Sequence, residues 1–419
     1  MKKKILIYAH YYAPDVASTG QILQDLAEGM RDELDVTVIC TVPSYTGKIA
    51  EEYKENKFFR EEINGVNVLR VPVPEFTKSS KKSRVRNLLA YYHGARKATE
   101  IVEKQDYVLT ISQPPIMGGM LGVYGKKKLG AKLIYCIQDF NPEQIMAIGY
   151  FRIKAVLKAA MRLDKRSCRK SDLVVTVGRD LCKTLEHRFR GEPVPNYVMI
   201  NNWIDENQIK PLPEDDPDVT AFRKQFNLDG KFVIMYSGNI GLYYDLEGLF
   251  RVIESVQNLK TPDGREVVFA FVGEGSMLGK LRDYQQTHQM ENVVFIPYQE
   301  KDRLIYSLNA ADVHWCVNAK GIKGVSCPSK FYGIAAAGKP VLAVLERGTE
   351  IRMLIEEIGC GKCTEPGEYE EIRKIILWFA EHAGEKEVQD MGKRANEHLR
   401  MHLTKEISVK KYIGAINRL

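Results

Sequence analysis

The stretch Phe232-Val-Ile-Met-Tyr-Ser-Gly-Asn-Ile-Gly241 passes directly from an apolar run into a loop with two glycines. A helical pattern follows near 245–258, and the next apolar run, Val267–Val272, again ends in a glycine loop, Gly-Glu-Gly-Ser. A short apolar run bounded by turn residues predicts a buried strand. The repeated order of strand, glycine loop and helix therefore predicts a parallel sheet covered by helices.

The same alternation extends from this stretch toward both ends of the chain. Downstream, further strands are expected at 293–296, 313–316 and 341–344. Upstream, a separate series of strands is expected at 5–8, 36–39, 66–71, 107–111, 132–137 and 173–177. Helices are expected at 22–33, 86–103, 151–168 and 276–288, and one long polar helical tail at 386–419. Two such series indicate two doubly wound α/β domains.

The boundary between the two series is marked by KPLPEDDPD at 210–218, whose Pro and Asp content is typical of a surface connection. We place the hinge near 198–210. The sequence therefore predicts a first domain over 1–200 and a second over 201–399. In doubly wound sheets, ligands bind outside the carboxyl ends of the strands, so function is sought in the loops that follow strands.

The composition excludes several classes of protein. The 419 residues, 44% hydrophobic and 27% charged, have the balance of a globular chain. No apolar run is long enough for a membrane-spanning helix, and the basic N-terminus lacks the apolar stretch of a signal peptide. The eight cysteines are scattered, which favours reduced thiols in a cytoplasmic protein. Cys360 and Cys363 form the one close pair, without the further ligands that zinc would need.

The charge is a mild excess of 61 basic over 54 acidic residues, and its placement is uneven. Residues 78–96 and 154–172 are both rich in Lys and Arg. Neither run accompanies a recognition motif, so nucleic acid is not an expected partner. Residues 78–96 mix these cations with Val85, Leu89 and other apolar residues, which suits peripheral contact with an anionic membrane. A solvated charged helix face is the alternative.

The first loop, after the strand at 5–8, has features of an anion site. Ser18, Thr19 and Gly20 stand at the start of a helix, where backbone amides favour a phosphate. The alternative is an ordinary turn in which Ser18 or Thr19 caps the helix. In the second series, Gly238 and Gly273 follow successive strands and would let a ligand approach the backbone closely. Two such loops in succession favour a nucleotide-binding half.

The most specific stretch is CPSKFYGIAAAGKP at 327–340. We expect Ser329 to cap a helix, Gly338 to end it and Pro340 to open the next strand. A helix start that carries Lys330 can bind a pyrophosphate through backbone amides, the helix dipole and a point charge. A plain capped core helix is the alternative.

Taken in chain order, these stretches and their neighbours resemble the GT-B-type retaining glycosyltransferases of family four, also called glycosyl transferases group 1. The stretches that carry the resemblance are 11–30, 137–143, 198–205, 236–250, 271–281, 328–344 and 347–351. The subgroup that they resemble builds surface polysaccharides such as O-antigen and capsule. The resemblance implies two Rossmann-like domains facing a cleft, with a C-terminal helix at about 400–419 crossing back to the first domain.

The resemblance also implies the reactants. A nucleoside diphosphate sugar would bind the second domain. We expect the nucleotide to be UDP, and an N-acetylated hexosamine is one candidate for the sugar. A lipid-linked or polysaccharide acceptor would bind the first. No further cofactor and no metal are implied, and no Asp-x-Asp string stands near a strand end.

The chain departs from the family pattern at the donor site. Family members commonly have Arg and Lys where this chain has Asn239 and Tyr244, and a Glu-x7-Glu pair that falls here near Val325 and on Gly333. Lys330 therefore becomes the main diphosphate ligand by resemblance, and Glu350 either contacts the ribose or serves as a surface cap. The expected donor-binding residues are Gly20, Gly238, Asn239, Gly273, Ser329, Lys330 and Glu350.

On the acceptor side, Asp139 and Glu143 follow the strand at 132–137 and are the expected catalytic residues. A carboxylate there could orient the acceptor or act as its base, although Asp139 could instead cap a helix. His10, at the end of the first strand, is the expected acceptor contact, and a structural role is the alternative for a lone histidine at this position. Without an evident nucleophile, transfer with retention would proceed by front-face attack, through placement of the reactants and stabilisation of the leaving diphosphate.

Two other functions are compatible with the sequence. A nucleotide-sugar epimerase of the same fold would need no acceptor. A non-catalytic nucleotide-sugar-binding subunit would explain the missing glutamates at Val325 and Gly333.

Overall fold

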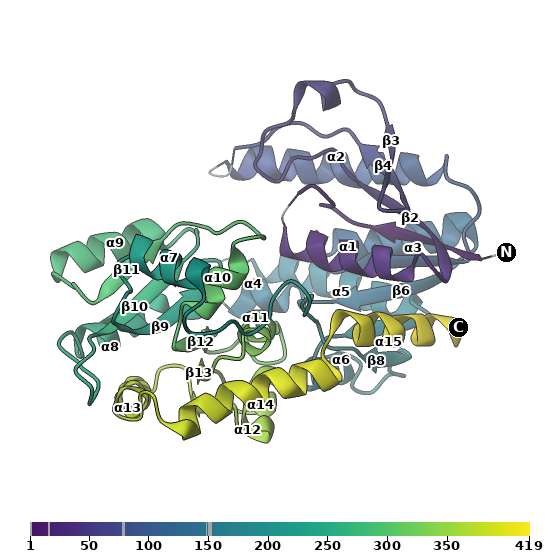
Figure 1. Cartoon of the computed structure of the whole chain (residues 1–419). Helices are drawn as coiled ribbons and strands as arrows, with labels where there is room; N and C mark the ends of the chain where they lie inside the picture. Colours follow the sequence, from purple (N-terminus) through teal and green to yellow (C-terminus); the bar gives the residue numbers. More distant parts are fainter. Residues whose placement is uncertain (1, 16, 78–79, 148, 150–152) are drawn as a thin grey trace. The chain divides into compact units, whose positions relative to one another are not determined.

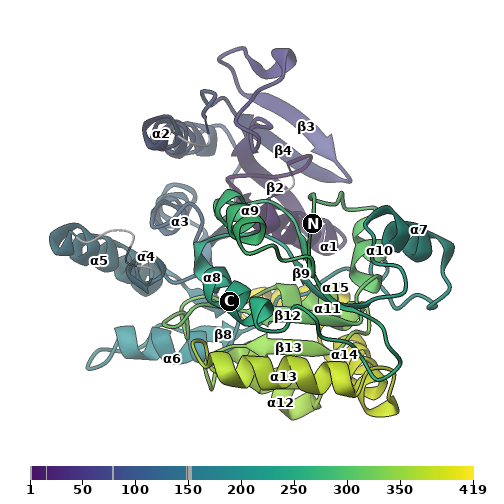
Figure 2. The same ribbon diagram turned by 90° about the vertical axis from the view of Figure 1, so that its left-hand side faces the viewer.

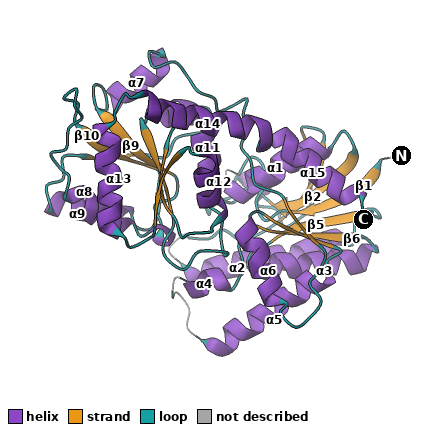
Figure 3. Cartoon of the chain, turned by 90° about the horizontal axis from the view of Figure 1, so that it is seen from below, coloured by secondary structure: helices purple, strands orange, loops and turns teal. Residues whose placement is uncertain are grey.

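The computed structural model describes residues 2–15, 17–77, 80–147, 149 and 153–419 (Figure 1). The chain divides into two compact units, Met1–Asn201 with Glu406–Leu419, and Asn202–Lys405. Each unit has its own sheet, flanked by helices (Figure 3). Within the described ranges, every helix is too short or too polar to cross a membrane.

The first unit is built on an eight-stranded sheet with the order β3-β4-β2-β1-β5-β6-β7-β8. Its strands are β1 (Lys3–Tyr8), β2 (Leu34–Thr41), β3 (Phe59–Ile63), β4 (Val66–Val71), β5 (Tyr107–Ile111), β6 (Lys132–Ile137), β7 (Leu173–Thr176) and β8 (Tyr197–Met199). All pairs are parallel except β3 with β4. The strand order reverses direction between β1 and β5, where ligands of such sheets bind.

The helical elements of this unit are α1 (Ser18–Met30), η1 (Glu51–Tyr53), α2 (Lys81–Thr99), α3 (Met117–Leu129), α4 (Glu143–Ala147), α5 (Lys154–Lys170), α6 (Arg179–Arg188) and α15 (Lys405–Asn417). Helix α3 lies between α2 and α5 and contacts both, so these three helices form one layer beside the sheet (Figure 2). Helix α15 packs on α1, with Val409 against Gly29.

Glycines bring α3 very close to the sheet. A Cβ atom on Gly122 would lie 2.4 Å from Cγ2 of Thr110, and one on Gly119 would lie 2.8 Å from Cβ of Ser167 on α5. Real side chains do not tolerate such distances, so α3 depends on glycine for its contacts with both neighbours.

The second unit has a six-stranded, fully parallel sheet with the order β11-β10-β9-β12-β13-β14. Its strands are β9 (Phe232–Ser237), β10 (Val267–Val272), β11 (Val293–Ile296), β12 (Val313–Val317), β13 (Val341–Val344) and β14 (Gly361–Thr364). The helical elements are α7 (Pro217–Gln225), η2 (Leu242–Tyr244), α8 (Leu246–Glu254), α9 (Leu278–Thr287), α10 (Leu304–Asn309), α11 (Lys330–Ala336), α12 (Glu350–Ile358), α13 (Tyr369–Glu381) and α14 (Lys386–His402). Here the order reverses between β9 and β12, which places the expected ligand position at their carboxyl ends.

The sequence predictions fail at three of the four sheet edges and in the tail, whereas the edge strand β11 is confirmed. Strands β3, β8 and β14 were not expected from the sequence. The tail is two helices rather than one polar helix, because the chain turns at Leu403 and Thr404, both of which are buried. Helix α15 is not polar throughout, since it buries Tyr412 and Ile416 in the first unit.

Candidate functional site

Two glycine loops at the carboxyl ends of β9 and β10 form the floor of the candidate donor site. Gly238 and Gly273 have φ values of +138° and +132°, which L side chains rarely adopt. A Cβ atom on Gly273 would lie 2.2 Å from the carbonyl oxygen of Gly238. The loops therefore pack backbone against backbone, and both positions require glycine.

Lys330 runs across this floor. Its Cε atom lies 2.7 Å from where a Cβ atom on Gly238 would stand, so the glycine makes room for the lysine. The Nζ atom lies 3.9 Å from the ring centre of Tyr244 and 5.1 Å from that of Tyr236, a cation–π arrangement. Burial alone would lower the pKa of Lys330, but the two phenol groups outweigh it and raise that pKa. The side chain is therefore an ammonium ion at neutral pH.

The start of α11 differs from the prediction. Ser329 has helical backbone angles, and its side chain makes no capping hydrogen bond, so the predicted Ser329 cap is wrong. Ser329 is instead exposed beside Lys330. Gly338 does end the helix as predicted, since it follows the last helical residues with φ +66°.

The other donor candidates of the second unit take different positions. Asn239 is exposed, and its backbone carbonyl accepts a 2.6 Å hydrogen bond from the Tyr236 hydroxyl. Glu350 begins α12 and is only 2% exposed, so a surface cap is the wrong interpretation of it. Gly333, where the family resemblance implied a glutamate, faces Leu308 and Ile204. A carboxylate at Gly333 would meet these apolar side chains.

Gly20 belongs to the first unit, separate in the fold from the other donor candidates. A Cβ atom there would lie 2.9 Å from the carbonyl oxygen of Tyr11, so Gly20 allows α1 to approach the first loop. The helix is preceded by Ala17 and has no side-chain cap. The alternative interpretation of this loop, in which Ser18 or Thr19 caps the helix, is therefore wrong.

His10 follows β1 at the switch point of the first sheet. It is buried beside Tyr11 and Tyr91, with ring centres 4.0 and 4.9 Å away. Burial lowers the pKa of His10 to about 4, so the imidazole is neutral at physiological pH. Within the described ranges, its Nε2 atom has no hydrogen-bond partner.

The loop after β6 carries Asp139 and Glu143. The hydroxyl oxygen of Ser112, which follows β5, accepts hydrogen bonds from the backbone N–H groups of Gln138 and Asp139, at 3.1 and 3.3 Å. Asp139 is half-buried, and α4 begins four residues later, at Glu143. The ends of β5 and β6 therefore fix the backbone at Asp139.

Arg188, which the sequence analysis missed, holds the far end of the same loop. It donates to both carboxylate oxygens of Glu143, at 2.6 and 2.5 Å, and to the carbonyl of Asn141 at 2.8 Å. Its Nη1 atom lies 2.5 Å from Asp164, which also accepts a hydrogen bond from Tyr135. Burial raises the pKa of Asp164, with Arg188 acting in the opposite direction. Glu143 is thus tied into a buried ion-pair network.

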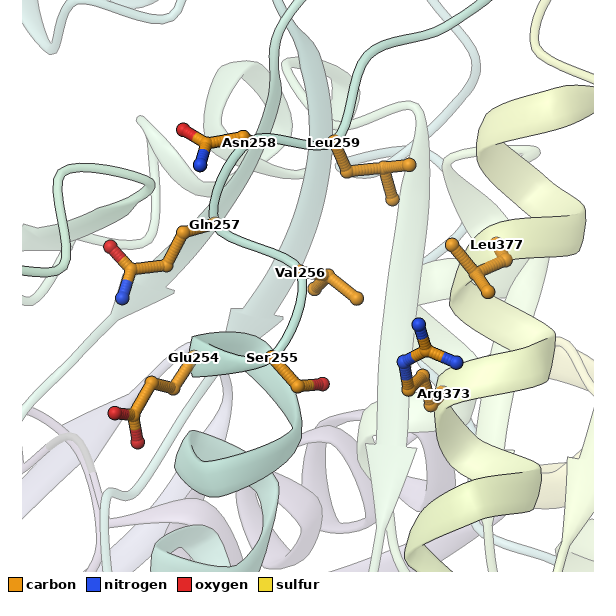
Figure 4. A pocket seen from close by; sticks show the side chains of 8 residues that line it. All are labelled: Glu254, Ser255, Val256, Gln257, Asn258, Leu259, Arg373 and Leu377. Carbon is orange, nitrogen blue, oxygen red and sulfur yellow. The ribbon is translucent and has the colours of Figure 1, made fainter.

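Two of the hollows in the described part of the chain can be compared with the candidate site. One, of about 450 Å³, is lined by 254–259, Arg373 and Leu377 (Figure 4). It lies between the end of α8 and the start of β10, at the opposite end of the strands from the glycine loops, so it is not the candidate donor site. The other, of about 610 Å³, belongs to the first unit and includes Pro72–Glu75, at the carboxyl end of β4.

Two family models match the chain. The glycosyl transferase 4-like domain matches residues 19–203, and glycosyl transferases group 1 matches residues 218–398. Among curated proteins, the chain is 27% identical over 387 residues to the putative colanic acid biosynthesis glycosyl transferase WcaI of Escherichia coli K12, covering 89% of this chain and 92% of that protein. It is 25% identical over 327 residues to the probable glycosyltransferase WbjE of Pseudomonas aeruginosa, covering 77% of each.

The fold is also that of solved structures. Sucrose-phosphate synthase from Thermosynechococcus elongatus has a TM-score of 0.77 at 13% identity, covering 100% of this chain and 98% of that one. HepE from Anabaena, solved in complex with UDP and glucose, has a TM-score of 0.71 at 16% identity. The match covers 100% of this chain and 100% of HepE. With glycosyltransferase domains matched in both units, the chain is a GT-B glycosyltransferase that carries a 4-like domain in its first unit and a group 1 domain in its second.

Proposed function

We propose that the chain transfers a sugar from a nucleoside diphosphate sugar to a lipid-linked or polysaccharide acceptor during cell-surface glycan assembly. WcaI supports this, because it is named for colanic acid biosynthesis. Retention at the anomeric carbon, an acceptor of the O-antigen or capsule type and an N-acetylated hexosamine as the sugar are parts of the same proposal.

The observation that carries the proposal is Lys330, held as a cation over the glycine loops. A departing diphosphate gains negative charge, which a fixed ammonium ion and accessible backbone stabilise. Gly238 and Gly273 add no side chains of their own to the floor of the site, and Gly238 leaves room there for Lys330. We propose a UDP-linked donor because HepE, which shares the fold, was solved with UDP.

For the first unit we propose that Asp139 orients the acceptor hydroxyl or takes its proton. Glu143 acts by holding the loop that carries Asp139, since both of its carboxylate oxygens are bonded to Arg188. His10, neutral and buried, contacts the acceptor as a hydrogen-bonding group. Front-face attack requires no covalent intermediate, so placement of the reactants supplies most of the catalysis.

We further propose that the reaction takes place at the cytoplasmic face of the membrane, with residues 78–96 touching anionic lipid. Residues 78 and 79 lie outside the described part of the chain, and most of the remainder belongs to α2.

Calorimetric titration with UDP and UDP-sugars tests the donor site. We expect Lys330→Ala to weaken nucleotide binding by about tenfold to a hundredfold, because a charge-assisted hydrogen bond contributes roughly 1.5–3 kcal/mol. Arg373→Ala is the matched control, since it removes a cation from the hollow at the opposite end of the strands. Equal affinities for all three proteins would remove Lys330 from the donor site.

Product analysis then separates transfer from the alternatives. Sugar should appear on an added lipid-linked acceptor and, with donor alone, no epimerised nucleotide sugar should accumulate. Epimerisation without acceptor, or tight binding without turnover over a panel of donors and acceptors, would contradict the proposed transfer.

A further inference from the structure

The layer formed by α2, α3 and α5 exposes almost no negative charge. Helices α2 and α3 contain no Asp or Glu, and α5 contains one, Asp164. Asp164 is 2% exposed and faces inward to Arg188. The outer side of this basic layer therefore presents cations without interspersed carboxylates from its own helices.

The cations of α5 form a row. Lys154, Lys158, Arg162 and Arg166 follow one another at intervals of four residues, which places them along one side of the helix. Within the described ranges, none of these four pairs with a carboxylate, whereas Lys165 and Arg169 both pair with Glu192. The row is therefore available to an external anionic surface.

Apolar side chains are exposed beside these cations. On α5, Val156 and Leu163 are seven residues apart, hence on one side of the helix, and are 51% and 39% exposed. On α2, Val85 and Leu89 are four residues apart and are 51% and 43% exposed, next to Arg86. Exposed aliphatic groups within a basic face are typical of helices that lie in a lipid interface.

We propose that the outer faces of α2 and α5 form a single docking surface for an anionic lipid bilayer. The aliphatic side chains enter the headgroup region, and the unpaired Lys and Arg side chains lie at the lipid phosphates. The docking surface extends the proposed membrane contact of 78–96 to α5. It rests on the proposed function in one respect: a lipid-linked acceptor would require the enzyme to reach the membrane. A nucleic acid would use the cations but gains nothing from Val156 and Leu163.

Vesicle co-sedimentation tests the surface, with phosphatidylglycerol–phosphatidylcholine vesicles compared with phosphatidylcholine alone. We expect binding that rises with the anionic fraction and weakens with salt. Lys158→Glu with Arg162→Glu, and separately Val156→Asp with Leu163→Asp, should each reduce binding about tenfold or more. The four side chains are solvent-facing, so circular dichroism and the melting temperature should stay near those of the unchanged protein.

The second unit provides the matched controls. Arg400→Glu with Lys393→Glu makes the same charge change on α14, and Met401→Asp replaces a side chain that is 62% exposed there. Both should bind vesicles as the unchanged protein does. The indole introduced by Leu163→Trp should be quenched by brominated lipid, whereas the one introduced by Met401→Trp should not.

Three results would overturn the proposal. They are no vesicle binding, binding that the Val156→Asp and Leu163→Asp pair leaves unchanged, and retention on a polynucleotide with none on vesicles. Because no donor or acceptor is present in these assays, their failure leaves the proposed transfer untouched, and failure of transfer leaves the docking surface untouched.

Discussion

At the scale of single residues, Lys330 and Arg188 show two opposite uses of a buried cation. Lys330 rests on the rings of Tyr236 and Tyr244, whose faces hold the ammonium group without an ion pair to any described carboxylate and leave it able to bind an anion. Arg188 has its charge matched by Glu143 and Asp164. The first arrangement suits a ligand site, and the second suits the positioning of a loop.

Removing the cation of Arg188 should destabilise the fold in a pH-dependent way. Arg188→Met leaves Asp164 and Glu143 without their counter-charge. Breaking a buried ion pair in this way should lower the free energy of unfolding at pH 8 by about 3–5 kcal/mol. Without Arg188, the pKa of Asp164, already raised by burial, rises further above its usual 3.8. A carboxyl with a raised folded-state pKa stabilises the fold below the unfolded-state pKa, and that contribution is lost as pH rises through the folded-state pKa.

The destabilisation measured by denaturant unfolding should therefore grow from pH 5 to pH 8. Arg166→Met, which removes a cation from the outer side of α5, should cost little at either pH. An equal loss for Arg188→Met at both pH values would contradict the assigned coupling.

The same two residues show how far a sequence predicts a site. The sequence singles out Lys330 as a candidate because it stands at a helix start, and the structure places its side chain over the glycine loops. Arg188 could not, because its partners lie 24, 45 and 47 residues away in the chain and share no motif with it. Capping by Ser18, Thr19 or Ser329 failed because a capping residue type does not determine its backbone angles.

At the scale of elements, the central strands were predictable, whereas three of the four edge strands, β3, β8 and β14, were not; the fourth, β11, was predicted at 293–296. A central parallel strand is buried on both faces, so it is a plain apolar run such as Val267–Val272. Strand β3, FREEI, lies at an edge, and three consecutive charged residues separate its two apolar ends, so it has neither an apolar run nor an alternating pattern. Strands β8 and β14 are also edges; β8 spans only three residues, and β14, GKCT, has no apolar run.

Helix α3 gives a test at this scale. Gly122→Ala should destabilise the fold by about 1–3 kcal/mol, because the added methyl group would lie 2.4 Å from Thr110 in a packed interface. Gly279→Ala on α9 is the control, since nothing lies within 4 Å of its added methyl group. It should be neutral or stabilise by about 0.5 kcal/mol. Equal unfolding midpoints for the two variants would show that α3 can move away from the sheet.

At the scale of the whole molecule, the chain returns to its first unit after completing the second. Helix α15 supplies Tyr412 and Ile416 to the core of the first unit. There the Tyr412 hydroxyl forms a hydrogen bond with the Cys136 thiol, whose pKa burial raises to about 12. The resemblance implied this return, whereas the sequence pattern alone gave only a polar tail. Lys410 and Lys411 interrupt the apolar residues of α15, so its buried face is hard to recognise without its partner.

Loss of the α15 anchor should weaken the first unit selectively. Tyr412→Ala removes a fully buried aromatic side chain, which costs about 3–5 kcal/mol. Hydrogen exchange should accelerate in β6 of the first unit and stay unchanged in β9 of the second. Met401→Ala, at an exposed position on α14, should alter neither strand, and faster exchange in both units after Tyr412→Ala would contradict a selective effect.

The positions of the three tryptophans have a practical consequence for following the two units. Trp203, Trp315 and Trp378 all belong to the second unit, and the first contains none. Intrinsic emission under selective indole excitation would thus record melting of the second unit alone, whereas far-ultraviolet dichroism averages both. Divergence of the two melting curves would measure how independently the halves of this enzyme unfold.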